Sequence, residues 1–152
     1  MLEDDANVLI HFDNGAKGIL YASQISVGEE NNLKIRVYGE KGGIEWHQQE
    51  PNSLILNLLN KPMQILRTGD NTNLCQQAIK NTRLPGGHPE GLIEAFANIY
   101  RNFAKTVRAS NAGFILDNQD FASVHDGLRG MQFIDAVVES ASSNEKWIKL
   151  KS

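Results

Sequence analysis

The period of the hydrophobic pattern changes once along this chain, and this change constrains the fold more than any other feature of the sequence. Over residues 6–67 apolar and polar residues largely alternate, which is typical of half-buried strands. From Leu92 to Val107 the apolar residues recur every three or four positions, which is typical of an amphipathic helix. Strands followed by helices, without β-α-β alternation, predict an α+β fold: an open, predominantly antiparallel β-sheet with helices on one face.

Residues 1–67 form the predicted sheet half, with about six strands in an antiparallel meander. Asn14-Gly15 predicts a tight hairpin with a type I′ turn, in which both central residues have positive φ. The glycine-rich residues 39–43 predict a second hairpin turn. The apolar runs that define the strands are 6–12, 16–25, 33–38, 44–47, 53–59 and 63–66.

Residues 68–88 are a polar connector with a short helix expected over 74–80, and residues 89–152 are the helical half. A second long helix is expected over 118–141, capped by Asp117 and favoured at its positive end by Asp120. The tail at 147–150 alternates like a final edge strand. The whole chain, 1–152, has the length of a single domain.

Apolar residues also occupy positions that a solvated strand face would not require. We therefore expect the second sheet face to be buried by another subunit or domain. Gly127 and Gly130 lie inside the second helical pattern, which suggests that another backbone approaches closely there. The apolar residues found on both alternating sets of the strands are Leu9, Ile19, Leu20, Ile55 and Leu59.

Composition excludes several classes of protein. The formal net charge is -3 and no run of Lys and Arg stands out, which argues against a nucleic-acid partner. No apolar run approaches the roughly 18 residues of a membrane span, and MLEDDANV lacks the features of a signal peptide, so we expect a cytoplasmic protein without a membrane partner. Cys75 is the only cysteine, which excludes an internal disulfide.

The stretch RLPGGHPEGLIEAF, residues 83–96, carries the strongest candidate site. Pro89 suits the first helical position, which would make His88 the N-cap and place Glu90 in the first turn. Histidine is not a preferred N-cap, so either the segment is only a helix start or the imidazole contacts a ligand hydroxyl. Arg83 and Arg101 are further candidates for anion or hydroxyl contacts.

Other chemistry finds less support in the residues. Neither glycine-rich stretch matches a phosphate-binding fingerprint, although a phosphate site at residues 85–91 remains a further alternative. His11 and His47 lie on strands with no paired carboxylate at metal-ligand spacing, and His125 and Asp126 point in different directions on a helix, so no metal site is expected.

Four phrases, taken in order, resemble the C-terminal domain of the Gfo/Idh/MocA oxidoreductases, the glucose-fructose oxidoreductase and inositol dehydrogenase family. The resemblance covers nearly the whole chain and ends with Trp147. The phrases are DANVLIHFDNGAKGILYASQ, RVYGEKGGIEW, GHPEGLIEAFANIYRNFA and DGLRGMQFIDAVVESA.

The resemblance implies one half of a two-domain enzyme. In the family an N-terminal Rossmann domain binds NAD or NADP and carries a Glu-Lys-Pro segment whose lysine assists proton transfer. The C-terminal domain shapes a sugar or polyol pocket, and its exposed sheet face often forms the dimer interface. A substrate hydroxyl is oxidised by hydride transfer, or a ketone is reduced.

Carried onto this chain, the resemblance makes Gly87–Gly91 a pocket-lining segment. We expect His88 to bind the substrate, with Arg83 and Glu90 as further candidates, and their role to be the orientation of hydroxyls. The resemblance implies no catalytic, cofactor-binding or metal-binding residue in this chain.

The chain departs from the family because it has neither a Rossmann fingerprint nor a Glu-Lys-Pro segment, and its start falls inside the family's domain. We therefore expect a fragment that is inactive alone and that forms a homodimer or higher homo-oligomer in the complete enzyme, where NAD or NADP is the cofactor. The alternative is a free-standing binding or assembly module derived from the same domain.

Overall fold

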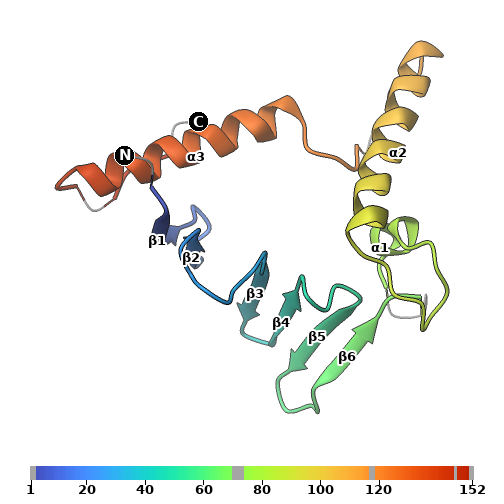
Figure 1. The fold of residues 1–152 in the computed structure, drawn as a ribbon, viewed down its shortest axis with the longest axis horizontal. Coiled ribbons are helices and arrows are strands. Elements are labelled where there is room, and N and C mark those ends of the chain that lie inside the picture. Colours follow the sequence, from blue (N-terminus) through green and yellow to red (C-terminus); the bar gives the residue numbers. More distant parts are fainter. Residues whose placement is uncertain (1–2, 70–73, 117–118, 146, 151–152) are drawn as a thin grey trace. The chain divides into compact units, whose positions relative to one another are not determined.

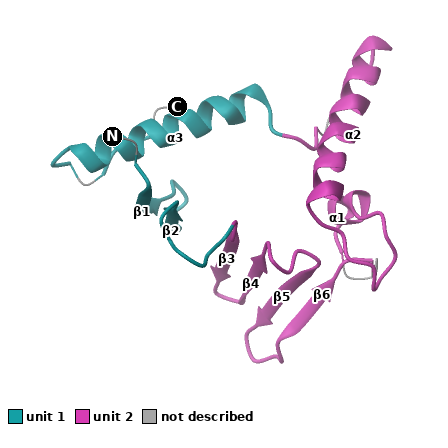
Figure 2. Cartoon of the chain, in the orientation of Figure 1, with its two compact units in different colours: residues 1–30, 122–152 teal, residues 31–121 magenta. Residues whose placement is uncertain are grey.

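The computed structural model describes residues 3–69, 74–116, 119–145 and 147–150. These residues form two compact units (Figure 2): residues 1–30 with 122–152, and residues 31–121. The first unit contains strands β1 and β2 and helix α3, and the second contains strands β3 to β6 and helices α1 and α2 (Figure 1). The strands are β1 Asp5–His11, β2 Lys17–Ser23, β3 Lys34–Gly39, β4 Gly42–His47, β5 Ser53–Leu58 and β6 Gln64–Arg67, and the helices are α1 Gln76–Asn81, α2 Leu92–Asn111 and α3 Val124–Ser142.

The predicted α+β class with open antiparallel sheets is confirmed. The strands are divided between a two-stranded sheet, β1-β2, and a four-stranded sheet in the order β3-β4-β5-β6. Every pairing is antiparallel and joins strands that are consecutive in sequence, as expected of a meander. At the β3–β4 turn Gly42 must be glycine, because a Cβ there would collide with the carbonyl oxygen of Asn57 on β5.

The hairpin β1–β2 is confirmed, but its predicted turn type is wrong. Gly15 has φ +87°, whereas Asn14 is absent from the residues with positive φ, so the loop is not a type I′ turn. The N–H of Gly15 donates to the carbonyl of Phe12 at 2.9 Å, and the N–H of Phe12 donates to the carbonyl of Ala16 at 3.0 Å. These bonds describe a three-residue loop in which only the glycine takes the left-handed conformation.

The four-stranded sheet has two different faces, which follow from its register. On one face the paired residues are apolar except for Gln64, which pairs with Leu56. On the other face a charged pair, Arg36 with Glu45, continues into Ile55 and Ile65. The two rows of the apolar face are Ile35, Trp46, Leu54, Leu66 and Val37, Ile44, Leu56.

The hairpin β1–β2 has apolar residues on both faces, as the sequence predicts. Leu9 and Ile19 pair on the face opposite Val8 and Leu20, and they are 65% and 81% exposed. Residues of the hairpin, among them Val8, Leu9 and Leu20, line a cavity of about 770 Å³ together with residues of α3.

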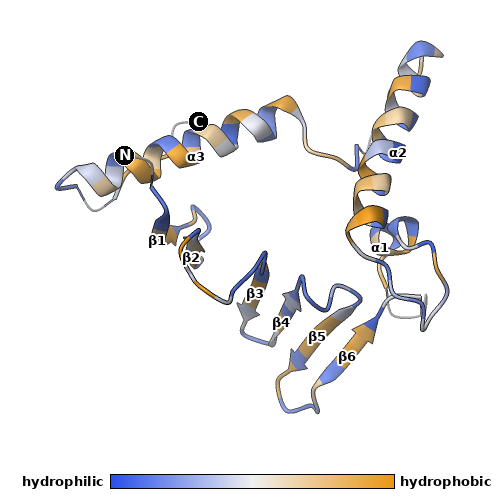
Figure 3. Cartoon of the chain, viewed as in Figure 1, coloured by the Kyte–Doolittle hydropathy of each residue, from blue (hydrophilic) through white to orange (hydrophobic). Residues whose placement is uncertain are grey.

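Hydrophobic residues recur along both long helices (Figure 3), and they are exposed there. Among the described residues no apolar side chain is buried, and Asn98 on α2 is the one buried polar side chain, at 9% exposure.

Both long helices are confirmed, but both begin later than predicted. Helix α2 begins at Leu92 with Gly91 as its N-cap, so Pro89 is not the first helical residue and His88 is not the cap. Helix α3 begins at Val124 with Ser123 as its N-cap. Asp117, the predicted cap, lies outside the described residues.

The expected final edge strand is not formed. Residues 147–150 are not a strand; instead the indole of Trp147 stacks on the imidazole of His11, with ring centroids 4.0 Å apart. The close backbone approach expected at Gly127 and Gly130 stays a prediction: within their own unit, a Cβ built at either glycine would meet no described atom within 4 Å. The short connector helix is present, as α1.

Candidate functional site

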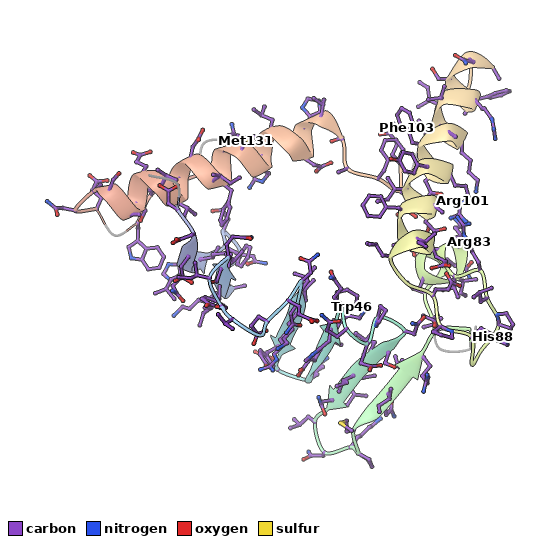
Figure 4. The ribbon with its side chains drawn as sticks, in the orientation of Figure 1. Trp46, Arg83, His88, Arg101, Phe103 and Met131 are labelled. Carbon is purple, nitrogen blue, oxygen red and sulfur yellow. The ribbon has the colours of Figure 1, made fainter. Side chains whose placement is uncertain are left out.

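The segment from Arg83 to Gly91, which we call the His88 loop, connects α1 to α2 within the second unit (Figure 4). It contains all three predicted substrate-binding residues, and it has no regular secondary structure of its own. The conformation is therefore set by the hydrogen bonds that the loop makes with its neighbours.

Asn52, directly before β5, joins the His88 loop to the sheet. Its Nδ2 donates to the carbonyl oxygen of Glu90 at 2.8 Å, and its Oδ1 accepts the N–H of Glu90 at 3.0 Å. The same Oδ1 accepts the hydroxyl of Thr68 at 3.1 Å, and the N–H of Thr68 donates to the carbonyl of Asn52 at 3.1 Å. The sequence analysis missed both residues, because a polar residue in a turn carries no signal for a partner 38 positions away.

The carboxylate of Glu90 closes the loop on itself. Its Oε1 accepts the N–H of Arg83 at 2.5 Å and the N–H of Leu84 at 2.6 Å. Glu90 is half-buried and precedes the helix, so the prediction that it lies in the first turn of α2 is wrong. In the structure Glu94 interacts with the helix start instead, since its Oε2 accepts the N–H of Gly91 at 2.8 Å, a bond that lowers the pKa of Glu94.

Two glycines bring the loop against the end of β6. Gly69 has φ +85°, and a Cβ there would collide with the backbone nitrogen of Gly86. Beside this contact lies a cavity of about 370 Å³, whose lining includes Arg67, Thr68 and Gly87. Gly69 is thus required twice, by its backbone conformation and by the close approach.

His88 is exposed on the outer side of the loop (Figure 4). Its N–H donates to the carbonyl of Pro85 at 3.2 Å, and its Nδ1 lies 3.3 Å from the same oxygen. Because a carbonyl oxygen only accepts hydrogen bonds, this contact requires the proton on Nδ1. The neutral imidazole then presents Nε2 as an acceptor, which suits a ligand hydroxyl.

The two candidate arginines are partly occupied by backbone and amide groups of the chain. Arg83 donates from Nε to Oδ1 of Asn98 at 3.0 Å, and Asn98 in turn donates to the carbonyl of Asn81 at 2.6 Å. Arg101 donates to the carbonyl of Lys80 and to Oδ1 of Asn81, both at 2.9 Å. Arg101 therefore joins α2 to the end of α1, whereas Arg83 remains part of the His88 loop.

A second polar cluster lies on the charged face of the four-stranded sheet. Nε of Arg36 lies 3.3 Å from Oε2 of Glu45, and Oε1 of Glu45 is hydrogen-bonded to Nε2 of His47. The hydrogen bond with His47, more than the charge of Arg36, holds the pKa of Glu45 below its ordinary value. The sequence-based expectation for His47 concerns only metal-ligand spacing and does not include this hydrogen bond to Glu45. The period of two in a strand carries the signal, since residues 45 and 47 share a face.

The described residues contain neither a metal-binding cluster nor a membrane-spanning helix. No group of three or more His, Cys, Asp or Glu side chains there is placed to hold a metal ion. None of the helices in this part of the chain combines the length and the apolar character needed to cross a bilayer.

Comparison with known proteins identifies the family. The model of the oxidoreductase family, C-terminal alpha/beta domain (Gfo/Idh/MocA), matches residues 2–150. The chain belongs to this family, which confirms the resemblance found in the four phrases.

Individual relatives agree with the family match. The chain is 37% identical, over 99% of its length, to the uncharacterized oxidoreductase YfiI of Bacillus subtilis, of which it covers 38%. An oxidoreductase from Sinorhizobium meliloti has a TM-score of 0.90 and 40% identity, with 97% of this chain and 42% of that one covered. An inositol dehydrogenase homolog from Azotobacter vinelandii, complexed with NADH and myo-inositol, has a TM-score of 0.89 and 32% identity, with 97% and 39% covered.

The chain thus spans only about two fifths of the length of these relatives, between 38% and 42%. The remaining length of those proteins corresponds to nothing in this chain.

Proposed function

We propose that this chain is the substrate-binding and oligomerisation domain of an NAD(P)-dependent sugar or polyol oxidoreductase of the cytoplasm. Family membership and the partial coverage of the relatives support this assignment. The Azotobacter homolog, complexed with NADH and myo-inositol, indicates the class of cofactor and substrate. The nicotinamide supplies the hydride chemistry in such an enzyme, and an N-terminal Rossmann domain is the partner that would hold it.

The described residues do not fit the cofactor itself. A dinucleotide site needs a glycine-rich loop between a strand and a helix, whereas residues 39–43 connect two strands and the His88 loop connects two helices, with Gly86 against Gly69. Hydride transfer therefore needs residues outside this chain, and the chain alone is expected to be inactive. Tight binding of NADH to the isolated chain, followed by nicotinamide fluorescence, would overturn this part of the proposal.

The exposed imidazole of His88 is the observation that carries the substrate-binding role. Its Nδ1 faces the carbonyl of Pro85, so its Nε2 is the acceptor for a hydroxyl that a sugar or polyol donates. The loop that carries it is fixed at both ends, at Arg83 and at Glu90, so the ligand need not order it. Arg83 and Glu90 are assigned secondary roles, because their polar atoms already bind the loop and Asn98.

The test is steady-state kinetics on the full-length protein that contains this chain. A panel of polyols and sugars, including myo-inositol, is assayed with NAD and with NADP, and the best substrate is then used for variants. We expect His88→Ala to lower kcat/KM by about 10- to 100-fold, through loss of a hydrogen bond of about 1–3 kcal/mol. Lys105→Ala, an exposed change on α2, is the matched control.

Two results would contradict the substrate-binding role. One is the absence of turnover on every member of the panel. The other is a His88→Ala variant with unchanged kinetics on the best substrate.

The oligomerisation role is supported by the exposed apolar side chains of the hairpin and the sheet. Leu9 and Ile19 lie on one face of β1–β2 and are more than half exposed, and such patches mark interfaces in soluble proteins. Light scattering on the full-length protein should give a homodimer or a larger assembly. A strict monomer at high concentration would refute the role.

The same exposed apolar surface would also suit the alternative function, that of a free-standing binding or assembly module. An upstream reading frame that encodes G-x-G-x-x-G and Glu-Lys-Pro in the same protein separates the enzyme from the module. The phosphate alternative is less well supported, because the N–H of Gly91 at the start of α2 already donates to Glu94.

A further inference from the structure

We propose that Asn52 is the positioning residue of the His88 loop, and that it acts on substrate binding through His88. The proposal rests on the substrate-binding role proposed for His88. It concerns a residue of the sheet that touches neither His88 nor, in this proposal, the substrate.

The two-point contact with Glu90 requires an amide. A primary amide carries a donor and an acceptor side by side, and Asn52 uses both on the backbone of one residue, at 2.8 Å and 3.0 Å. A carboxylate offers acceptors only, and an alanine offers neither group. Asparagine at position 52 therefore continues the sheet's hydrogen bonding into a segment that is not a strand.

Asn52 is itself held in place by β6. Asn52 and Thr68 follow the last pair of the β5–β6 ladder, Ser53 with Arg67, and they are joined by two further hydrogen bonds. The side chain is half-buried at this position. The amide is thus a fixed reference point rather than a side chain that follows the loop.

The effect reaches His88 through the backbone of Glu90. Glu90 lies two residues from His88, and its carboxylate bonds back to Arg83 and Leu84. Fixing the backbone of Glu90 therefore fixes both ends of the loop, and this also fixes the position of the His88 imidazole, which lies between these ends. Releasing Glu90 leaves the internal hydrogen bonds intact but removes the side-chain hydrogen bonds that tie the C-terminal part of the loop to the sheet, so that among the described residues only the contact of Gly86 with Gly69 and the bond from Arg83 to Asn98 remain.

The experiment compares Asn52→Ala with His88→Ala and with the double variant, in the full-length protein, on the best substrate of the panel that includes myo-inositol. We expect Asn52→Ala to raise KM for that substrate about tenfold, since both hydrogen bonds to Glu90 are lost, with KM for the nicotinamide cofactor unchanged. Because Asn52 acts through His88, the double variant should be no worse than His88→Ala alone. Asn57→Ala, an exposed asparagine on β5, is the matched control.

Hydrogen exchange reports the loop independently of activity. The amide of Glu90 should exchange at least about tenfold faster in Asn52→Ala than in the parent protein or in Asn57→Ala. Asn52→Asp keeps the acceptor for this amide and for Thr68 but loses the donor, so its KM should lie between those of the parent and Asn52→Ala. It also serves as the test if the alanine variant does not fold.

The possible failures are distinguishable. If His88→Ala changes nothing, the proposed substrate-binding role fails, and this inference fails with it. If His88→Ala weakens binding but Asn52→Ala does not, or if the effects of the two changes are additive, the positioning role is wrong while the role of His88 stands. Equal losses for substrate and cofactor would mean a general defect in folding and would also refute the positioning role.

Discussion

The two long helices begin in contrasting ways. Helix α3 starts with residues that are close in sequence: Ser123 Oγ accepts the N–H of Asp126 at 3.2 Å, and the carboxylate of Asp126 accepts the N–H of Ser123 at 2.7 Å. Helix α2 starts after the His88 loop, which is fixed by Asn52, 38 residues before Glu90. The start of α3 is thus fixed by local contacts alone, whereas the start of α2 combines a local bond, from the N–H of Gly91 to Glu94, with hydrogen bonds from the preceding loop to Asn52.

The contrast explains where function can be placed. A reciprocal cap such as that of α3 satisfies backbone groups at the helix start but positions nothing else. The loop before α2 is held by a residue distant in sequence, Asn52, and its tip with His88 is therefore held at a defined place. Substrate-binding side chains benefit from this second arrangement, because a fixed loop loses little entropy when a ligand binds.

The largest expected effect comes from breaking the contact between Gly69 and Gly86, which holds the loop before α2. Gly69→Ala should lower stability by about 2–3 kcal/mol, because φ is +85° and the new Cβ would collide with the backbone of Gly86. Thermal unfolding of the full-length protein measures this loss of stability. Gly127→Ala is the matched change within α3, where a Cβ has open space, and it should raise stability by about 0.5–1 kcal/mol.

A smaller effect is expected at Glu90. Glu90→Ala removes the acceptor for two backbone N–H groups and should cost about 1–3 kcal/mol, with faster exchange at the amides of Arg83 and Leu84. Glu90→Gln keeps one carbonyl oxygen and should be milder. Glu139→Ala, an exposed change on α3, is the control, and equal exchange in all three variants would show that Glu90 does not close the loop.

The smallest effect concerns the cap of α3 and its dependence on pH. Hydrogen bonds from the side chain and backbone of Ser123 lower the pKa of Asp126 from its ordinary value of 3.8. A carboxyl whose pKa is lower in the folded state stabilises that state above the unfolded pKa, and this contribution is lost as the pH falls through the folded pKa. Exchange of the first amides of α3 should therefore quicken, relative to the intrinsic rate, as the pH falls below about 4.

Ser123→Ala tests the same cap at neutral pH, with an expected cost of about 1 kcal/mol in the stability of α3. Kinetics on the substrate panel should stay unchanged in this variant. A pH response in Ser123→Ala as large as in the parent protein would exclude the hydrogen bonds with Asp126 as its cause.

The same contrast shows what the sequence can predict. Alternation over residues 6–67 predicts the meander, and the spacing of Leu92, Phe96 and Phe103 predicts α2, because both patterns reflect local geometry. The start of α2 is not predictable in this way: Pro89 suits a first helical position, but the backbone of its neighbour Glu90 is held by Asn52.

The residues of the candidate site also differ in whether the sequence alone reveals them. His88 stands out in the sequence, because an unusual residue in a Gly-Pro-rich segment is visible without a structure. Asn52 and Thr68 become visible only when the structure brings together the turn before β5, the end of β6 and the His88 loop. The pairing of Glu45 with His47 lies between these cases, since strand period places them on one face but does not show which polar group on that face is close enough to bond.

The atoms that anchor the His88 loop also determine which of its residues can be substituted without loss of the anchor. The groups held by Asn52 and by the Glu90 carboxylate are the main-chain atoms of Arg83, Leu84 and Glu90. Every amino acid except proline provides these atoms, so residues at the tip can be exchanged while the attachment persists. A library randomised at positions 84, 85 and 88, with position 84 kept free of proline, would therefore vary substrate preference while the hydrogen bonds that anchor the loop are kept.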